Sequence, residues 1–422
     1  MIYFLLPKTY IHTYKNIALE QNSEIPQAAI SSSLYHYLSD IKEKINIYES
    51  EWDIYKKYTN PFEYIHTMVP NKKKSISKIK PLSRSYFKLI EIVQTFNLID
   101  LDAPFINTFH LAEGPGGFIE ATKDLRKQPN DTYIGMTILH DSHDSNVPGW
   151  RKSQQFLRDN LNVIIENGAD NTGNILNFDN FVYCKEKYAS SMDFITGDGG
   201  FDFSEDFNKQ EINVARLLFG QIAFALCMQK QGGSFVLKIF DSFMLYTVDL
   251  LYILSSFYEK VYITKPHTIR YANSEKYIVC KNFLFSSCEP FYPFLHKAFL
   301  GITKVKEDSM TLYIQRFLNI PISNYFLTKM EEYNSIFGQQ QIENIYYTIS
   351  LIETKNKNEK IDNLLRNNIH KCVSWCIKMG IPYNQIANTN IFLFHKNGDF
   401  PIGELKNYDG TNEGKDNAVY EW

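Results

Sequence analysis

The sequence lacks several features that would place it in a specialised class of protein. It has six cysteines in 422 residues and no CxxC pair, so we exclude a disulfide-rich secreted scaffold and expect a reducing compartment. No run of eighteen apolar residues occurs, so we expect no membrane span. There is no excess of positive charge, because 44 Lys+Arg stand against 47 Asp+Glu for a net charge of -3. Any contact with nucleic acid must therefore be local rather than that of a polycation.

The overall composition is that of a folded globular chain. Hydrophobic residues make up 44%, charged residues 22% and aromatic residues 15%, which excludes collagen-like, fibrous and acidic disordered classes. At roughly 150 residues per domain, the length allows two to three domains, or one enzyme core with extensions. The start, MIYFLLPKTY, has six apolar residues before Pro7 and no basic region ahead of them, so we expect no signal peptide.

The middle of the chain alternates between short apolar runs and helix-like segments. Such alternation is typical of a parallel sheet covered by helices on both faces. The last two runs follow each other directly, which predicts an antiparallel finish on a doubly wound, Rossmann-like α/β sheet. The seven expected strands are 106–112, 132–139, 162–169, 192–200, 234–240, 261–266 and 275–285.

The two flanks of this α/β region look different from it. Residues 1–79 mix aromatic-rich and polar stretches and are expected to form a helical N-terminal extension. Residues 301–422 are predicted to be mainly helical, with a polar tail after Gly403. We therefore expect three regions, 1–79, 80–300 and 301–422.

A glycine-rich turn, LAEGPGGF, follows the first expected strand. Its Gly114, Gly116 and Gly117 would let backbone N–H groups approach a ligand, and the following helix N-terminus favours negative charge. A tight turn without a ligand is the plain alternative. A dinucleotide fingerprint would need a small residue at the sixth position, which is Ile119 here, so a dehydrogenase is disfavoured.

Two lysines and two carboxylates from four different elements are candidates for one site. Lys238 interrupts SFVLKIF, the most apolar strand, where burial of an ammonium is costly unless it is paired. Asp198 ends another strand at the edge where open α/β sheets bind ligands. Glu275 begins the last strand, and Lys88 lies on the helix before the sheet. Taken singly, a lysine reaching solvent at a strand end and a turn-forming aspartate would explain Lys238 and Asp198.

The order of these residues and their neighbours resembles the FtsJ-like, or RrmJ-type, RNA ribose 2′-O-methyltransferases. The branch most similar to it methylates ribose at the mRNA cap, and the resemblance extends to the asfarvirus-type enzymes of large cytoplasmic DNA viruses. The resemblance covers roughly residues 80 to 286. The matching stretches are SRSYFKL, HLAEGPGGF, GADNTGNI, DFITGDGGF, GGSFVLKIF and KPHTIRYANSEKYIVC.

The resemblance implies a seven-stranded methyltransferase sheet, S-adenosyl-L-methionine as cofactor and no metal. The adenine would lie near Asp170 and the sulfonium would point toward Asp198. The implied catalytic residues are Lys88, Asp198, Lys238 and Glu275. The implied cofactor-binding residues are Glu113, Gly114, Gly116, Gly117, Phe118, Gly135, Asp170 and Asp198. The implied RNA-binding residues are Lys78, Lys80, Arg84 and Asn273.

Two features of the sequence have competing explanations. His110 stands where much of the family has an aspartate, and by itself it is best explained as a hydrogen-bonded histidine at a strand end. The segment HDSHDSN, residues 140–146, offers two histidines and two aspartates, but it lacks a distant third ligand pattern, so we favour a polar loop over a metal site.

These observations favour an S-adenosylmethionine-dependent RNA 2′-O-ribose methyltransferase acting on cap-proximal nucleotides of mRNA. Lys238 would accept the proton of the ribose hydroxyl in its neutral form, which burial and Lys88 favour and the two carboxylates oppose. The alternative is a catalytically silent RNA-binding or scaffold subunit that retains the fold. The expected partners are the capped 5′ end of mRNA and other capping or transcription proteins, in the host cytoplasm and the virion, as the viral resemblance implies, with no membrane.

Overall fold

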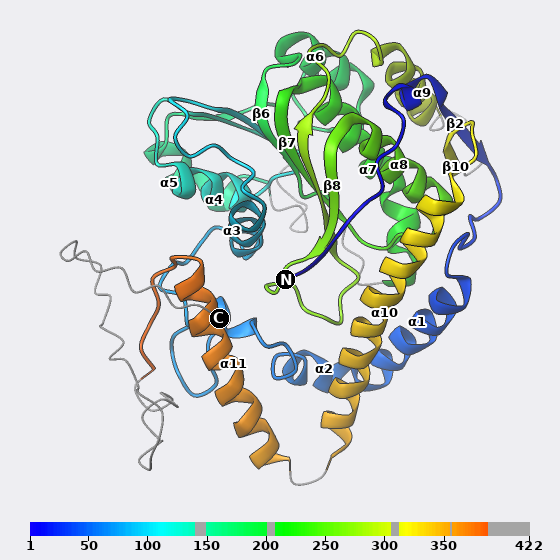
Figure 1. The fold of residues 1–422 in the computed structure, drawn as a ribbon. Helices are drawn as coiled ribbons and strands as arrows, with labels where there is room; N and C mark the ends of the chain where they lie inside the picture. The colour runs from blue at the N-terminus through cyan, green and yellow to red at the C-terminus, as the bar shows by residue number, and fades with distance from the viewer. Residues whose placement is uncertain (140–148, 201–206, 305–311, 355–356, 387–422) are drawn as a thin grey trace. The chain divides into compact units, whose positions relative to one another are not determined.

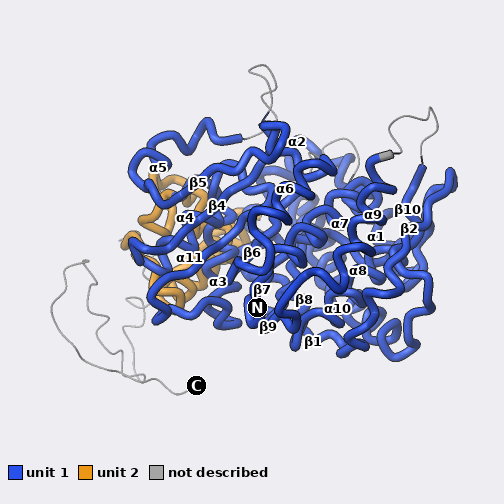
Figure 2. Tube along the Cα trace, turned by 90° about the horizontal axis from the view of Figure 1, so that it is seen from above, with its two compact units in different colours: residues 1–59, 81–355 blue, residues 60–80, 356–422 orange. Residues whose placement is uncertain are grey.

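The computed structural model describes residues 1–139, 149–200, 207–304, 312–354 and 357–386. The chain divides into two compact units, one made of residues 1–59 and 81–355 and the other of residues 60–80 and 356–422 (Figure 2). These units divide the chain differently from the three regions expected from the sequence. The reason is that residues 60–80 leave the first unit and associate with the C-terminal helix.

The first unit is built around one mixed sheet of eight strands. The central strands β6, β3, β4 and β5 run parallel with β7, whereas β9 is inserted antiparallel between β7 and β8. The spatial order is β1 (Ile2–Leu5), β8 (Tyr258–Lys265), β9 (Lys276–Phe283), β7 (Gln229–Ile239), β6 (Met192–Gly197), β3 (Asn107–Leu111), β4 (Thr132–Met136) and β5 (Val163–Ile165). The Rossmann-like doubly wound class and its antiparallel finish are confirmed.

The eighth strand, β1, comes from the segment that was expected to be helical. It pairs antiparallel with β8, with Ile2 opposite Lys265 and Leu5 opposite Tyr262. Residues of β1 alternate between half-buried and exposed, because β1 is an edge strand with one face covered. A four-residue run gives too little periodicity to reveal a strand in the sequence.

Helices cover both faces of the sheet (Figure 1). One face carries α3 (Ser85–Phe96), α4 (Gly117–Arg126) and α5 (Gln154–Asp159). The other carries α6 (Phe178–Tyr188), α7 (Gln210–Met228) and α8 (Leu245–Phe257). Most of the hydrophobic core lies between the sheet and this second set of helices.

Strand β7 shows how the core fixes the direction of its side chains. Phe235, Leu237 and Ile239 belong to the core cluster that contains the apolar residues of α7 and α8. Because successive side chains of a strand point to opposite faces, Lys238 lies on the face covered by α3 and α4. The core therefore directs this lysine toward the helix that carries Lys88.

Helix α7 is long and apolar enough to cross a membrane by length and composition alone. It has 19 residues, and 83% of its most apolar window is buried inside the fold. Packing against the sheet therefore accounts for its composition.

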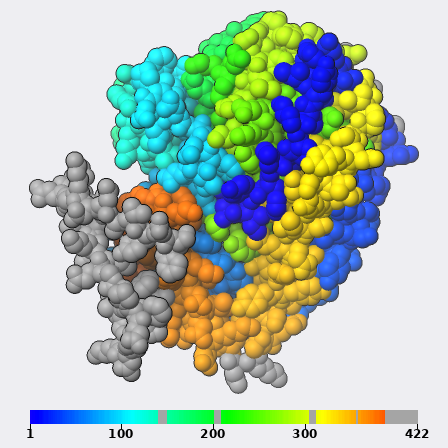
Figure 3. Space-filling model, in the orientation of Figure 1, coloured from blue at the N-terminus to red at the C-terminus, as the bar shows by residue number. Residues whose placement is uncertain are grey.

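The remaining elements of the first unit come from segments before and after the main strands of the sheet in sequence. β2 (Ile17–Asn22) pairs antiparallel with β10 (Tyr313–Leu318), and Arg316 of β10 forms a two-pronged ion pair at 2.7 and 2.9 Å with buried Asp249 of α8. Figure 3 shows the first residues, in dark blue, lying against the yellow segment that follows β10. The helices of this part are α1 (Ser32–Lys44), α2 (Glu49–Tyr55), α9 (Tyr292–Lys304) and α10 (Asn324–Glu353).

The second unit pairs α11 (Asn358–Lys378) with residues 60–80. The Cys372 thiol donates to the Pro61 carbonyl at 3.4 Å, and the Asn384 amide N–H donates to the Ile76 carbonyl at 2.7 Å. Cys372 and Cys376 are buried in this unit, as core packing predicts for two residues four apart on a helix.

Candidate active site

The four predicted catalytic side chains form two ion pairs at the carboxyl edge of the sheet. Lys88 of α3 donates from Nζ to Glu275 Oε1 at 2.5 Å. Lys238 Nζ lies 3.2 Å from Asp198 Oδ1 and donates to the backbone carbonyl of Asp198 at 2.6 Å. The side chains come from α3, the end of β6, β7 and the start of β9, so the convergence expected from the sequence occurs.

A fifth residue, Tyr277, joins the two pairs and was not foreseen. Its hydroxyl lies 2.9 Å from Asp198 Oδ1 and 3.0 Å from Glu275 Oε1, so its single proton is shared between two carboxylates. Tyr277 is fully buried, and it lies opposite Lys238 in the β7–β9 register. Because Tyr277 follows Glu275 by two residues, the period of a strand would have placed both on the same face.

The Lys88–Glu275 pair, here called the inner ion pair, is almost buried. The Lys238–Asp198 pair, the outer ion pair, is more exposed. The side chains of Lys88 and Glu275 are 7% and 9% exposed, whereas those of Lys238 and Asp198 are 14% and 17% exposed. Lys238 and Asp198 are therefore more accessible from outside than Lys88 and Glu275. Lys88, Glu275 and Tyr277 form the supporting layer behind them.

The charges of the inner pair are set by burial and by each other. Burial lowers the pKa of Lys88, and nearby Arg84 and Lys238 act in the same direction, against the pull of Glu275. Burial alone would raise the pKa of Glu275, but the charges of Lys88 and Lys238 and the hydrogen bond from Lys88 lower it to about 2. Glu275 is therefore a carboxylate at neutral pH.

The turn that carries Asp198 is held by Gln221, a buried residue of α7. Gln221 Oε1 accepts from the Gly199 N–H at 2.9 Å. A Cβ added at Gly197 or Gly199 would come within 2.7 or 2.8 Å of the same oxygen, so a larger residue at either position would displace the Gln221 side chain. This support for Asp198 was also missed in the sequence, since a glutamine within an apolar helix gives no specific signal.

Glu113, at the start of the glycine-rich turn, contacts the helix that follows, and its contact with the cofactor stays a prediction. Its Oε1 accepts from the backbone N–H groups of Phe118 and Ile119 at 2.7 and 3.0 Å, so it caps the first turn of α4. Burial raises the pKa of Glu113 well above its usual value, and the charge of Asp198 acts in the same direction. Two N–H groups of this helix N-terminus are therefore already occupied by protein.

The three glycines of the turn are close to other backbone and side-chain atoms. Gly116 has φ +107°, a conformation that favours glycine. A Cβ at Gly114 would lie 2.8 Å from the Gly149 carbonyl oxygen, and one at Gly117 would collide with the hydroxyls of Ser83 and Ser85.

The other residues expected at the cofactor lie in different environments. Phe118 is fully buried, and its ring centre lies 6.1 Å from that of Tyr277. A Cβ at Gly135 would come within 2.6 Å of the Trp150 ring, so this glycine makes room for an aromatic side chain. Asp170 is exposed and organises its own loop, since its carboxylate accepts from Thr172, Asn177 and Asn180. Cofactor contacts at these residues remain predictions.

His110 is a buried histidine satisfied by two threonines. Its ring nitrogens lie 2.8 Å from Thr196 Oγ1 and 3.0 Å from Thr108 Oγ1. Burial lowers the pKa of His110 to about 3, so the ring is neutral at neutral pH.

The residues expected to contact RNA are distributed over both units. Arg84 is exposed just before α3, and Asn273 is half-buried two residues before Glu275. Lys78 and Lys80 are exposed as well, but they belong to the second unit.

Within the described residues, no group of three His, Cys, Asp or Glu could hold a metal ion. The segment HDSHDSN lies outside them.

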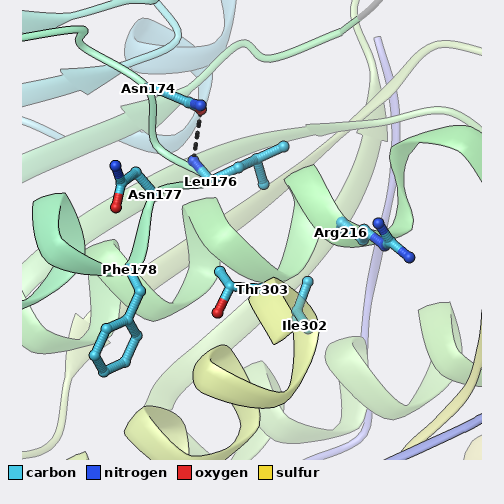
Figure 4. Close-up of a pocket in the computed structure, with 7 residues that line it drawn as sticks. All are labelled: Asn174, Leu176, Asn177, Phe178, Arg216, Ile302 and Thr303. Carbon is cyan, nitrogen blue, oxygen red and sulfur yellow. Dashed lines mark hydrogen bonds between the residues drawn. The ribbon is translucent and has the colours of Figure 1, made fainter. Parts of the chain in front are cut away.

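A pocket of about 270 Å³ occurs elsewhere in the first unit (Figure 4). Its lining contains no carboxylate or lysine that could act as an acid or base. Its walls are Asn174, Leu176, Asn177, Phe178, Arg216, Ile302 and Thr303.

Comparison with known proteins agrees with this geometry. The model of the FtsJ-like methyltransferase family matches residues 81–283. The chain is 26% identical to "Cap-specific mRNA (nucleoside-2'-O-)-methyltransferase 2" of Drosophila melanogaster, covering 79% of this chain and 48% of that protein. It is 30% identical to the Pongo abelii protein of the same name, covering 74% and 41%. It is 26% identical to a "Probable methyltransferase" of African swine fever virus, covering 62% and 61%. The chain thus spans about half the length of the cap-specific relatives.

Proposed function

With residues 81–283 assigned to the FtsJ-like methyltransferase family, we propose that the protein is an S-adenosylmethionine-dependent RNA ribose 2′-O-methyltransferase acting near the cap of mRNA. The observation that carries the proposal is the pairing of Lys88 with Glu275 and of Lys238 with Asp198, joined by Tyr277. An ion pair that only stabilises the fold does not require a second ion pair whose carboxylate contacts the same tyrosine hydroxyl. Two such pairs at the ligand-binding edge of the sheet favour a site for proton transfer.

In this proposal Lys238 is the base that removes the proton of the ribose hydroxyl. It is the more exposed of the two lysines, and Asp198 holds it through both a carboxylate oxygen and a backbone carbonyl. Lys238 must be neutral when it accepts the proton. The Tyr277 hydroxyl, which also contacts Glu275, holds the carboxylate of Asp198 in a fixed position, and this keeps the lysine oriented.

The cofactor would supply an electrophilic methyl group on a sulfonium. The turn between β3 and α4 is rich in glycine, with Gly116 at φ +107°, and the neighbouring strand β6 ends just before Asp198. Asn167 follows β5, three residues before Asp170, near which the resemblance places the adenine. Its Oδ1 is buried with no hydrogen-bond partner among the described residues. The amino group of an adenine is a suitable donor for that oxygen, so the residues present fit the cofactor.

The substrate class in this proposal is the capped 5′ end of mRNA. It is supported by the names of the relatives from Drosophila melanogaster and Pongo abelii. Arg84, four residues before Lys88, and Asn273, two residues before Glu275, would contact the RNA. Lys78 and Lys80 would contact phosphates. Other capping or transcription proteins are proposed partners. The six free, buried cysteines support a reducing compartment such as the cytoplasm.

The test is methylation of defined RNA by the purified full-length chain. Capped and uncapped RNAs of the same sequence are incubated with S-adenosylmethionine carrying a labelled methyl group, and the labelled nucleotide is mapped. The proposal expects label on the 2′-oxygen of a cap-proximal ribose. Label on a base, or none on any RNA, contradicts it.

The scaffold alternative is separated by calorimetry with S-adenosylmethionine, in the presence and absence of capped RNA. A protein that binds RNA but never the cofactor belongs to that alternative. No observation in the structure favours it, since a scaffold has no need of two lysines in a buried site.

A further inference from the structure

Four consecutive carbonyl oxygens in the segment before Glu275 each accept a hydrogen bond from a buried side chain. Three side chains supply these bonds, namely Lys265, Lys276 and Gln341. The acceptors are Tyr271 (from Lys265, 3.1 Å), Ala272 (from Gln341, 2.8 Å), Asn273 (from Lys265) and Ser274 (from Lys276, 2.8 Å).

The donors approach from the opposite side of the sheet to the ion pairs. Lys276 lies between Glu275 and Tyr277 in sequence, so its side chain points to the other face, where its Nζ lies 3.2 Å from Asp241 Oδ1. Lys265 ends the adjacent strand β8 on that same face. Gln341 comes from α10, which lies beyond the family match at residues 81–283.

Lys265 is an unusual residue to bury at this position. It is 3% exposed, and within the described part of the chain its amine has carbonyl partners but no ion pair. Burial lowers the pKa of Lys265 to about 7, with Lys276 and Lys42 acting in the same direction and Asp241 and Glu275 against it. An apolar residue would avoid the cost of burying an amine. The amine therefore has a use that an apolar side chain lacks, which is to hold two carbonyls of one short segment.

We propose that Lys265, assisted by Gln341, is a positioning residue that fixes segment 271–275 and so places Glu275 against Lys88 and Tyr277. Its catalytic consequence rests on the proposed function. When the segment loosens, Glu275 moves away from the Lys88 amine and the Tyr277 hydroxyl that it contacts. The orientation of Asp198 and Lys238 is then lost as well. Rate then falls without a matching loss of cofactor affinity, because Lys265 touches neither the glycine-rich turn nor Asp198 in the described structure.

The first test is independent of activity. Hydrogen–deuterium exchange of the full chain is compared between wild type, Lys265→Met and Gln341→Met. The matched control is Lys281→Met, since Lys281 also donates to a backbone carbonyl, that of Phe96 at 2.5 Å, but from the far half of β9. We expect peptides covering 271–277 to exchange at least about tenfold faster in Lys265→Met, and to be unchanged in the control.

The second test is kinetic and uses the same variants with capped RNA. We expect kcat to fall at least about tenfold in Lys265→Met and about threefold in Gln341→Met, with KM for RNA and Kd for S-adenosylmethionine within about twofold of wild type. A role confined to stability would lower the melting temperature and leave kcat of the folded enzyme unchanged.

Two results overturn the proposal: wild-type exchange and kcat in both variants, or a change in cofactor affinity as large as the change in kcat. If Lys265→Met does not fold, Gln341→Met decides by the same readouts. A wild-type protein that never methylates RNA contradicts the proposed function, whereas the exchange measurement still decides whether Lys265 holds the segment.

Discussion

Tyr277 lies directly opposite Lys238 in the antiparallel register of β9 and β7. The tyrosine hydroxyl bridges the two carboxylates, and the lysine amine contacts one of them. Sheet register thus couples the outer ion pair, which a substrate would meet, to the inner pair behind it.

Tyr277→Phe removes this bridge without changing the shape of the core. We expect the free energy of unfolding to fall by roughly 1.5–3 kcal/mol, since a hydrogen bond to a charged group is lost, and kcat to fall about tenfold. Thermal unfolding and methyl transfer are measured on the same preparation. Tyr258→Phe is the control, because the Tyr258 hydroxyl donates to Gln229 at 3.2 Å elsewhere in the sheet. A Tyr277→Phe enzyme with wild-type kcat would show that the bridge is only structural.

The inner ion pair predicts a dependence of stability on acid. Because the pKa of Glu275 is lowered to about 2 from an ordinary 4.5, its contribution is complete above pH 4.5 and is lost as the pH falls toward 2. The amount is on the order of 3 kcal/mol. Asp241, also with a pKa of about 2, titrates in the same window, so the quantity to measure is the difference between wild type and Glu275→Gln. Urea unfolding at several pH values should show this difference shrinking below pH 4.5.

The control for that experiment is Glu289→Gln, which removes an exposed carboxylate paired with Lys185. Its difference from wild type should be small and nearly constant with pH. A Glu275→Gln difference that is equally constant would argue against a buried, ionised Glu275.

Arg84 is expected to bind an RNA phosphate beside the inner ion pair. Arg84→Ala should raise KM for capped RNA several-fold and reduce the dependence of RNA affinity on salt by about one phosphate contact. Arg158→Ala on α5 removes an equally exposed positive charge and is expected to bind RNA like wild type. Equal effects of the two substitutions would mean that Arg84 contributes only to the general charge of the surface.

The sequence predicted that the four candidate side chains converge, but it did not predict which of them contact each other. Recognition of the sheet is enough to place three of them, Lys238, Asp198 and Glu275, at its carboxyl edge. Lys88 binds Glu275 across 187 residues of chain, and no local pattern indicates which lysine pairs with which carboxylate. That choice depends on how α3 packs on the sheet.

Glu113 and β1 show two further limits of the sequence. Cofactor contact by Glu113 stays a prediction, whereas its capping of the helix that follows the glycine-rich turn was not foreseen. β1 is four residues long and is stabilised by pairing with β8, from the other end of the domain. The pairing of β1 depends on a tertiary contact, and the capping by Glu113 depends on the side-chain geometry of one turn. Composition and periodicity contain neither.

The most direct test of the account is methyl transfer to capped RNA by Lys238→Ala, with S-adenosylmethionine affinity measured on the same sample. In the proposed mechanism Lys238 acts on the acceptor hydroxyl, so we predict that kcat falls by about 10²–10⁴, while cofactor Kd stays within about twofold and the melting transition is retained. A folded Lys238→Ala enzyme that methylates the ribose at the wild-type rate would contradict the account.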